Sequence, residues 1–140
     1  MKAITFLALL LTLTLAVSCN KDLPNDEVIN LDEVQTIIEG NLVEFKEGDF
    51  FIEFKEVSSD SRCPVNLVCE WEGVADIVLT IHQNETEKDV IIHTINSLGM
   101  QLSKTIECND YTIEVIQLSP IPGEPNYGDD FELDLKITKP

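Results

Sequence analysis

The sequence predicts an all-β domain: an antiparallel β-sandwich or small barrel of about six to eight strands, with one short-loop disulfide. Two observations predict this fold. Apolar residues recur at every second position in several segments, and short polar connections separate these segments. Such alternation, with one polar face, favours antiparallel pairing over a parallel sheet that is buried on both faces. Residues 31–140 are enough for a single core, so we expect one domain.

The individual strands follow from the same alternation. We expect them at residues 42–45, 50–57, 71–81, 90–94, 111–118 and 131–137. In the last of these, Glu132, Asp134 and Lys136 are predicted to point outward, and the apolar residues between them inward. Residues 34–38 are compatible with a further strand or with one turn of helix.

The N-terminal segment is typical of a secretory signal. Lys2 supplies a positive charge, an apolar run follows at residues 3–17, and the small residue Ser18 precedes Cys19. This run is shorter than the roughly 20 apolar residues that a transmembrane helix needs. A small residue before a cysteine resembles the bacterial lipobox, although Ala16 replaces the usual leucine. The alternative is an ordinary cleaved signal followed by a chance cysteine.

The lipobox reading sets the expected organisation of the chain. Residues 1–18 are the predicted signal peptide, and residues 19–30 are a lipidated Cys19 with a flexible tether. Asn20, rather than aspartate, follows the cysteine, and in the lipoprotein sorting rules that this resembles such a residue favours the outer membrane. We therefore expect a lipid-anchored protein of the bacterial cell envelope.

The chain is strongly acidic, with a formal net charge of −17. Removal of residues 1–18 takes away Lys2 and no acid, which leaves 8 basic and 26 acidic side chains, a net charge of −18. Such a surface repels nucleic acid and anionic lipid headgroups, so neither is an expected partner. The same acidic surface attracts cationic proteins, and its high net charge also keeps the protein soluble.

The segment SRCPVNLVCEWEGVA, residues 61–75, carries two cysteines near each other. In a secreted chain disulfides persist, and the short loop around Pro64 keeps Cys63 and Cys69 close, so we predict that they are joined. A redox centre would favour C-x-x-C at the start of a helix. A zinc site would need Cys108 and a histidine without the usual paired spacing. The predicted bridge does not include Cys108, and the sequence does not determine the oxidation state of this cysteine.

Trp71 follows the second cysteine by two residues. We predict that its ring is buried beside the bridge, on one face of the strand at 71–81, and that Gly73 leaves room for it. The alternative is an exposed Trp71 that stacks on a sugar or an incoming arginine.

The run S-R-C-P-x4-C-x-W-x-G-x-A in residues 61–75 resembles one found in small uncharacterised bacterial lipoproteins. Those chains also tend to end in a strand, a proline-rich loop and a final strand, as residues 111–118, 119–127 and 131–137 do here. The resemblance implies a secreted β domain and no particular reaction.

The chain offers no strong catalytic or metal motif. Asp129 and Asp130 belong to an acidic cluster without the spacing of an EF-hand, and neither His82 nor His93 lies in a known nucleophile motif. We therefore expect no cofactor, no metal site and no enzyme, although a fold can assemble a triad from distant residues.

The expected function is binding or bracing in the envelope. A rigid β scaffold with a cysteine-bounded loop and a proline-rich loop suits recognition of a cationic protein or a glycan, with Arg62, Asn66 and Tyr127 as candidate contacts. The alternative is an acidic, inhibitor-like binder of a basic secreted enzyme such as lysozyme.

Overall fold

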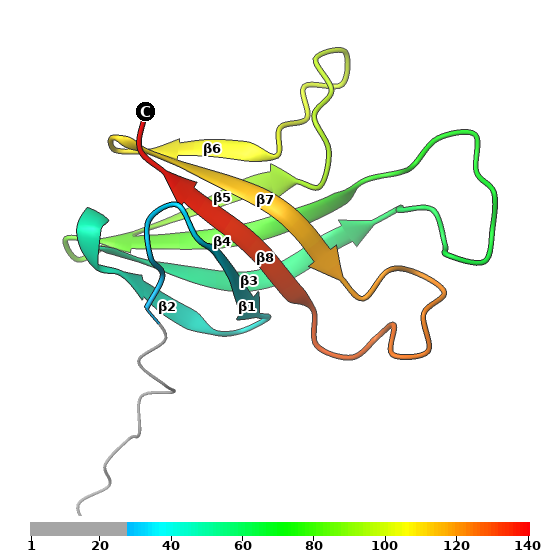
Figure 1. The fold of residues 1–140 in the computed structure, drawn as a ribbon, viewed down its shortest axis with the longest axis horizontal. Helices are drawn as coiled ribbons and strands as arrows, with labels where there is room; N and C mark the ends of the chain where they lie inside the picture. The colour runs from blue at the N-terminus through cyan, green and yellow to red at the C-terminus, as the bar shows by residue number, and fades with distance from the viewer. Residues whose placement is uncertain (1–27) are drawn as a thin grey trace, which may run out of the picture.

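The computed structural model describes residues 28–140, which form two antiparallel four-stranded sheets around one core (Figure 1). The first sheet has the strand order β2–β3–β4–β5, and the second has the order β1–β8–β7–β6. The predicted all-β antiparallel fold is confirmed, and it is a sandwich of two separate sheets. The predicted signal peptide, Cys19 and most of the predicted tether lie outside the described residues.

The eight strands have the following bounds: β1 Val34–Ile38, β2 Leu42–Phe45, β3 Phe50–Asp60, β4 Ala75–Gln83, β5 Thr86–His93, β6 Thr105–Cys108, β7 Tyr111–Ser119 and β8 Glu132–Thr138. A single 3-10 turn, η1 Lys46–Gly48, joins β2 to β3. In the described part of the chain no helix is long and apolar enough to cross a membrane.

Most of these strands lie where alternation predicts them, although β3 continues to Asp60 rather than ending at residue 57 and β5 begins at Thr86 rather than at residue 90. Three further segments need comment. The ambiguous segment 34–38 is a strand, because Ile37 points into the core while residues 36 and 38 face solvent. Strand β4 begins at Ala75 rather than at residue 71, so the segment before it belongs to a loop. Strand β6 was not predicted: it has four residues, and its pairing with β7 defines it.

The core is built from the inward faces of both sheets. Phe50, Ile52 and Phe54 of β3 are at most 1% exposed, whereas Phe51 between them is 41% exposed. Leu133, Leu135 and Ile137 of β8 are fully buried from the other side, as predicted. This burial of alternate residues supplies most of the favourable free energy of folding.

The folded domain begins earlier than the sequence indicated. Ile29 is fully buried in the core, and its amide N–H donates a hydrogen bond to the carbonyl of Glu44 at 2.9 Å. Val28 forms a parallel bridge with the same residue. Residues 28–30, assigned to the tether from their polarity and lack of periodicity, are thus part of the domain.

The two ends of the sandwich differ. The described chain enters beside Glu44, close to η1, and we call this the tether end (Figure 1). Strand β3 runs from here to Asp60 at the opposite end, where residues 61–74 (the disulfide loop) and 120–131 (the proline loop) project beyond the sheets (Figure 1). Phe51, the partner of His82, and Asp60 are nine residues apart, about 30 Å along a strand.

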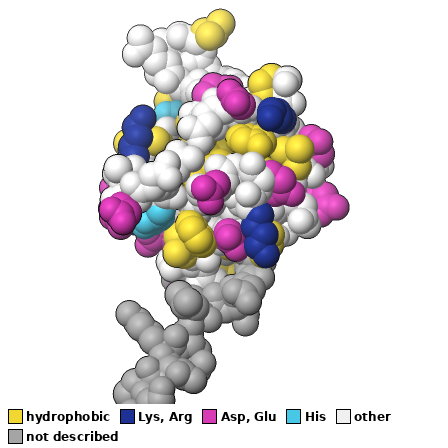
Figure 2. Space-filling model, turned by 90° about the vertical axis from the view of Figure 1, so that its left-hand side faces the viewer, with side chains coloured by type: hydrophobic (Ala, Val, Ile, Leu, Met, Phe, Trp, Pro, Cys, Tyr) yellow, Lys and Arg dark blue, Asp and Glu magenta, His cyan; other side chains and the backbone are white. Residues whose placement is uncertain are grey.

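Figure 2 faces the tether end and shows how charge is distributed there. Acidic side chains are interleaved with neutral and apolar ones, and Lys and Arg appear at only a few places. This mixture is what a solvated surface of high net charge requires.

Candidate functional site

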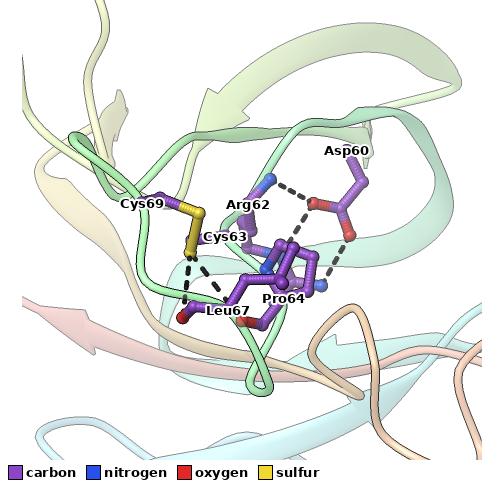
Figure 3. Close-up of a disulfide and its surroundings, with 6 residues drawn as sticks. All are labelled: Asp60, Arg62, Cys63, Pro64, Leu67 and Cys69. Atoms are coloured by element: carbon purple, nitrogen blue, oxygen red, sulfur yellow. Dashed lines mark hydrogen bonds and ion pairs between the residues drawn. A yellow bond between two sulfur atoms is a disulfide. The ribbon is translucent and has the colours of Figure 1, made fainter.

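The predicted disulfide is present at the base of the disulfide loop (Figure 3). Cys63 and Cys69 are joined, with their Cα atoms 6.0 Å apart. The two arms of the loop also pair through their backbones: the N–H of Ser61 donates to the carbonyl of Val74, and that of Cys63 to the carbonyl of Glu72, both at 2.8 Å. The loop is therefore fixed by a covalent bond and by hydrogen bonds.

Gly73 is required by this pairing. Its φ is +73°, and a Cβ added there would lie 2.0 Å from the carbonyl oxygen of Ser61. The two arms approach each other too closely for any side chain at this position. The sequence predicted that Gly73 makes room for the indole of Trp71, whereas the structure shows that it makes room for the opposite arm of the loop.

Arg62 anchors the disulfide loop to the sandwich (Figure 3). Its Nε and Nη2 donate to the two carboxylate oxygens of Asp60, at 2.9 and 2.7 Å, and both side chains are largely removed from solvent, with exposures of 11% and 6%. The guanidinium also donates to the carbonyls of Leu118 and Pro120. Four of its five N–H groups are thus used inside the protein, so its main role is structural.

The proline loop packs against the disulfide loop. The N–H of Val65 donates to the carbonyl of Pro122 at 2.9 Å, and the hydroxyl of Tyr127 donates to a carboxylate oxygen of Asp60 at 3.2 Å. Burial, and then the charge of Asp60, raise the pKa of Tyr127 above its usual value. Asn66 lies beside Gly123, where an added Cβ would be 3.0 Å from the Asn66 side-chain oxygen.

The three predicted contact residues therefore lie at one end of the molecule. Arg62 and Asn66 belong to the disulfide loop and Tyr127 to the proline loop, and Asp60 links Arg62 to Tyr127. Sequence reasoning missed Asp60. Its position directly after an alternating strand and two residues before an arginine was the available signal.

The tip of the disulfide loop is apolar and exposed. Val65 is 54% exposed, Leu67 61%, Val68 fully exposed and Trp71 49%. The prediction that Trp71 is a core residue is wrong. The alternation of β4 does not extend back past Ala75, because residues 61–74 leave the sheet and pair with each other instead.

The disulfide and proline loops also carry exposed acidic groups. Glu70, Glu72, Asp129 and Asp130 are exposed on the disulfide and proline loops, and Arg62 is the one basic residue of these two segments. Because Arg62 is neutralised by Asp60, the end of the sandwich presents negative charge around apolar side chains. This combination favours a partner that is both apolar and cationic.

A groove of about 410 Å³ lies beside the paired arms of the disulfide loop, where Cys63 and Gly73 line it. Its floor is aliphatic, formed by Ile95, Ile116, Leu118 and Ile121, and its rim includes Glu72. Strand β7 has a bulge between Val115 and Gln117, and this bulge turns Ile116 outward, where it is 42% exposed.

The histidines lie elsewhere, on the outer face of the β2–β3–β4–β5 sheet. His82 is 3.1 Å from Glu53 and 3.3 Å from Glu87, and His93 is 2.9 Å from Asp76. Among residues 28–140, no serine or cysteine is hydrogen bonded to either imidazole ring, and no group of three or more His, Cys, Asp or Glu side chains is arranged to hold a metal ion.

Cys108 is a free thiol on β6, at the side of the core. Burial raises the pKa of this thiol, with a small opposing effect from the charge of Lys88. A raised pKa lowers the thiolate fraction at neutral pH, and with it the reactivity of the group.

Comparisons of the chain with models of known protein families, with curated proteins and with solved structures found no match. The resemblance to small bacterial lipoproteins therefore rests on the motif in residues 61–75 and on the order of the elements that end the chain.

Proposed function

We propose that this protein is an envelope-anchored lipoprotein whose β domain binds a partner through the disulfide end and carries out no reaction. The observation that carries the proposal is the apolar tip of the disulfide loop. Exposed side chains of Val65, Leu67, Val68 and Trp71 are gathered on one short segment. Clustered apolar exposure on a soluble domain marks interaction sites more often than chance.

The rigidity of the tip supports recognition. The disulfide, the paired arms and the buried pair of Arg62 with Asp60 fix the loop before any partner arrives. A preordered loop loses little conformational entropy on binding, so more of the contact energy appears as affinity. Trp71 is a tryptophan, and tryptophan is one of the residue types enriched among the few side chains that contribute most of the binding free energy at protein interfaces.

The placement of the two ends also supports it. The described chain enters at the tether end, and the apolar tip lies at the other end of the roughly 30 Å strand β3. A lipid anchor joined to the tether end through a flexible segment would therefore leave the tip free to point away from the membrane, where a partner can reach it.

A second candidate is an inhibitor-like binder of a basic secreted enzyme such as lysozyme. The exposed acids around the tip favour it, because Glu70, Glu72, Asp129 and Asp130 would steer a cationic protein toward this end. The two candidates share the same surface and differ in whether the partner is a basic enzyme.

The test is capture of partners from envelope extract on the immobilised protein at low and at high salt. We expect a partner whose capture falls at least about tenfold with Val68→Glu, because a carboxylate replaces a fully exposed apolar contact. Leu98→Glu is the matched control, since Leu98 is equally exposed on the loop between β5 and β6.

The salt series separates the two candidates. A basic enzyme that is released by salt supports the inhibitor-like candidate, and a glycan or a salt-resistant partner supports the general one. Equal capture by the Val68→Glu and Leu98→Glu variants would contradict binding at the tip.

A further inference from the structure

The groove beside the disulfide loop is formed by strand β7 where its neighbour ends. Strand β6 pairs with β7 only from Tyr111 to Glu114, whereas β7 continues to Ser119 with β8 on its other side. On the β6 side the N–H of Val115 still donates to the carbonyl of Lys104 at 2.9 Å, and beyond this bond β7 is paired with β8 alone. Ile116 and Leu118, in this last part of β7, line the open groove.

The floor of this groove suits an aliphatic chain. Ile95, Ile116 and Ile121 approach it from three different segments, and Cys63 and Gly73 close it on the side of the disulfide loop. None of the residues that line it is aromatic, so a sugar ring would find no stacking surface there.

The rim of the groove offers mainly hydrogen-bond acceptors. Glu72 is exposed, and within residues 28–140 its carboxylate forms no ion pair. One N–H of the Gln117 side-chain amide donates to the hydroxyl of Ser119 at 3.0 Å, and the amide oxygen can accept a hydrogen bond. Arg62, the one cation on the rim, is held by Asp60 and two backbone carbonyls.

We propose that this groove binds a lysine or arginine side chain on an extended segment of the protein partner. The aliphatic stem lies over Ile95, Ile116 and Ile121, and the cationic head pairs with Glu72. Lysine and arginine carry the apolar stem and charged end that this combination requires. The inference rests on the proposed function and specifies the chemistry of the partner.

Charge complementarity decides in favour of a cationic protein segment. The disulfide and proline loops expose four acids, and their single basic residue is already neutralised. An anionic lipid, a phosphate or an acidic peptide would meet repulsion at this end.

The probes are synthetic pentapeptides, acetyl-Ala-Ile-Lys-Ile-Ala-amide and the same peptide with norleucine or glutamate in place of lysine. Each is titrated into the isotopically labelled protein while backbone amide resonances are followed. We expect the lysine peptide to shift the amides of Ile95, Ile116 and Leu118. Norleucine keeps the stem and removes the charge, so its affinity is expected to fall about tenfold or more.

Two protein variants with the same change in charge complete the test. Glu72→Gln is expected to weaken the lysine peptide about tenfold, and Glu70→Gln, on the same loop but outside the groove, to leave it nearly unchanged. Equal effects of the two variants, equal binding of the norleucine peptide, or no shift at these amides would overturn the proposal.

Other occupants are outcomes of the same titration. Shifts of the groove amides with protein concentration alone would show that a second copy of the chain fills the groove, and would overturn the proposal. Failure of the peptide test with Val68-dependent capture intact would remove this inference and leave the proposed function standing.

Discussion

Replacing Arg62 with alanine is expected to lower the free energy of unfolding by about 3–5 kcal/mol. The substitution leaves the carboxylate of Asp60, which is 6% exposed, without its cationic partner. It also removes the donors to the carbonyls of Leu118 and Pro120, so the disulfide loop loses these links to β7 and to the proline loop and keeps the bond from Val65 to Pro122. Chemical denaturation of the wild type and the variant measures the difference.

Two further variants separate the charge from the hydrogen bonds. Arg62→Lys keeps the charge but cannot reproduce the planar fork that binds both oxygens of Asp60, so we expect an intermediate loss. Asp60→Ala combined with Arg62→Ala removes both charges and should recover part of the stability. An Arg62→Ala protein of unchanged stability that no longer binds its partner would instead make Arg62 a contact residue, as the sequence first suggested.

Cys19→Ser is expected to move the protein from the membrane fraction to the soluble fraction. The prediction rests on the lipid anchor, because two or more acyl chains attach a protein stably and serine cannot be lipidated in this way. Fractionation followed by detection of the protein in each fraction measures the effect. Asn20→Ser, next to the acceptor position, is the control and should keep the protein in the membrane fraction.

Retention of the Cys19→Ser protein in the membrane fraction would contradict the lipoprotein prediction. It would leave the β domain and the proposed binding surface unaffected, because both are built from residues 28–140.

The strands were predictable because each sheet has one face in the core. In β3 and β8 the burial of every second residue imposes the alternation directly on the sequence. Strand β6 could not be found this way: it has four residues, and only its register with β7 identifies it. Local alternation is also the reason that Trp71 was wrongly predicted to be buried. Its spacing from Ala75 is that of a strand, but the backbone at Trp71 lies outside the sheet, because β4 begins only at Ala75.

The candidate site was predictable in part. The cysteine spacing was sufficient to indicate the bridge, and Arg62, Asn66 and Tyr127 were placed on two loops that do meet. The burial of Arg62 was not predictable, because its partners Leu118 and Pro120 are more than fifty residues away in sequence. The groove depends on a bulge and on the end of a neighbouring strand, and neither leaves a local pattern.

The central claim is that the partner binds at the apolar tip, away from the tether end. Site-specific photocrosslinking in intact cells tests it most directly, with a photoreactive phenylalanine analogue at Leu67 and, for comparison, at Leu98 and Ile91, which are all exposed. We predict a discrete crosslinked adduct from position 67 and none from positions 98 and 91. Adducts from position 91 or 98 with none from position 67 would contradict the account.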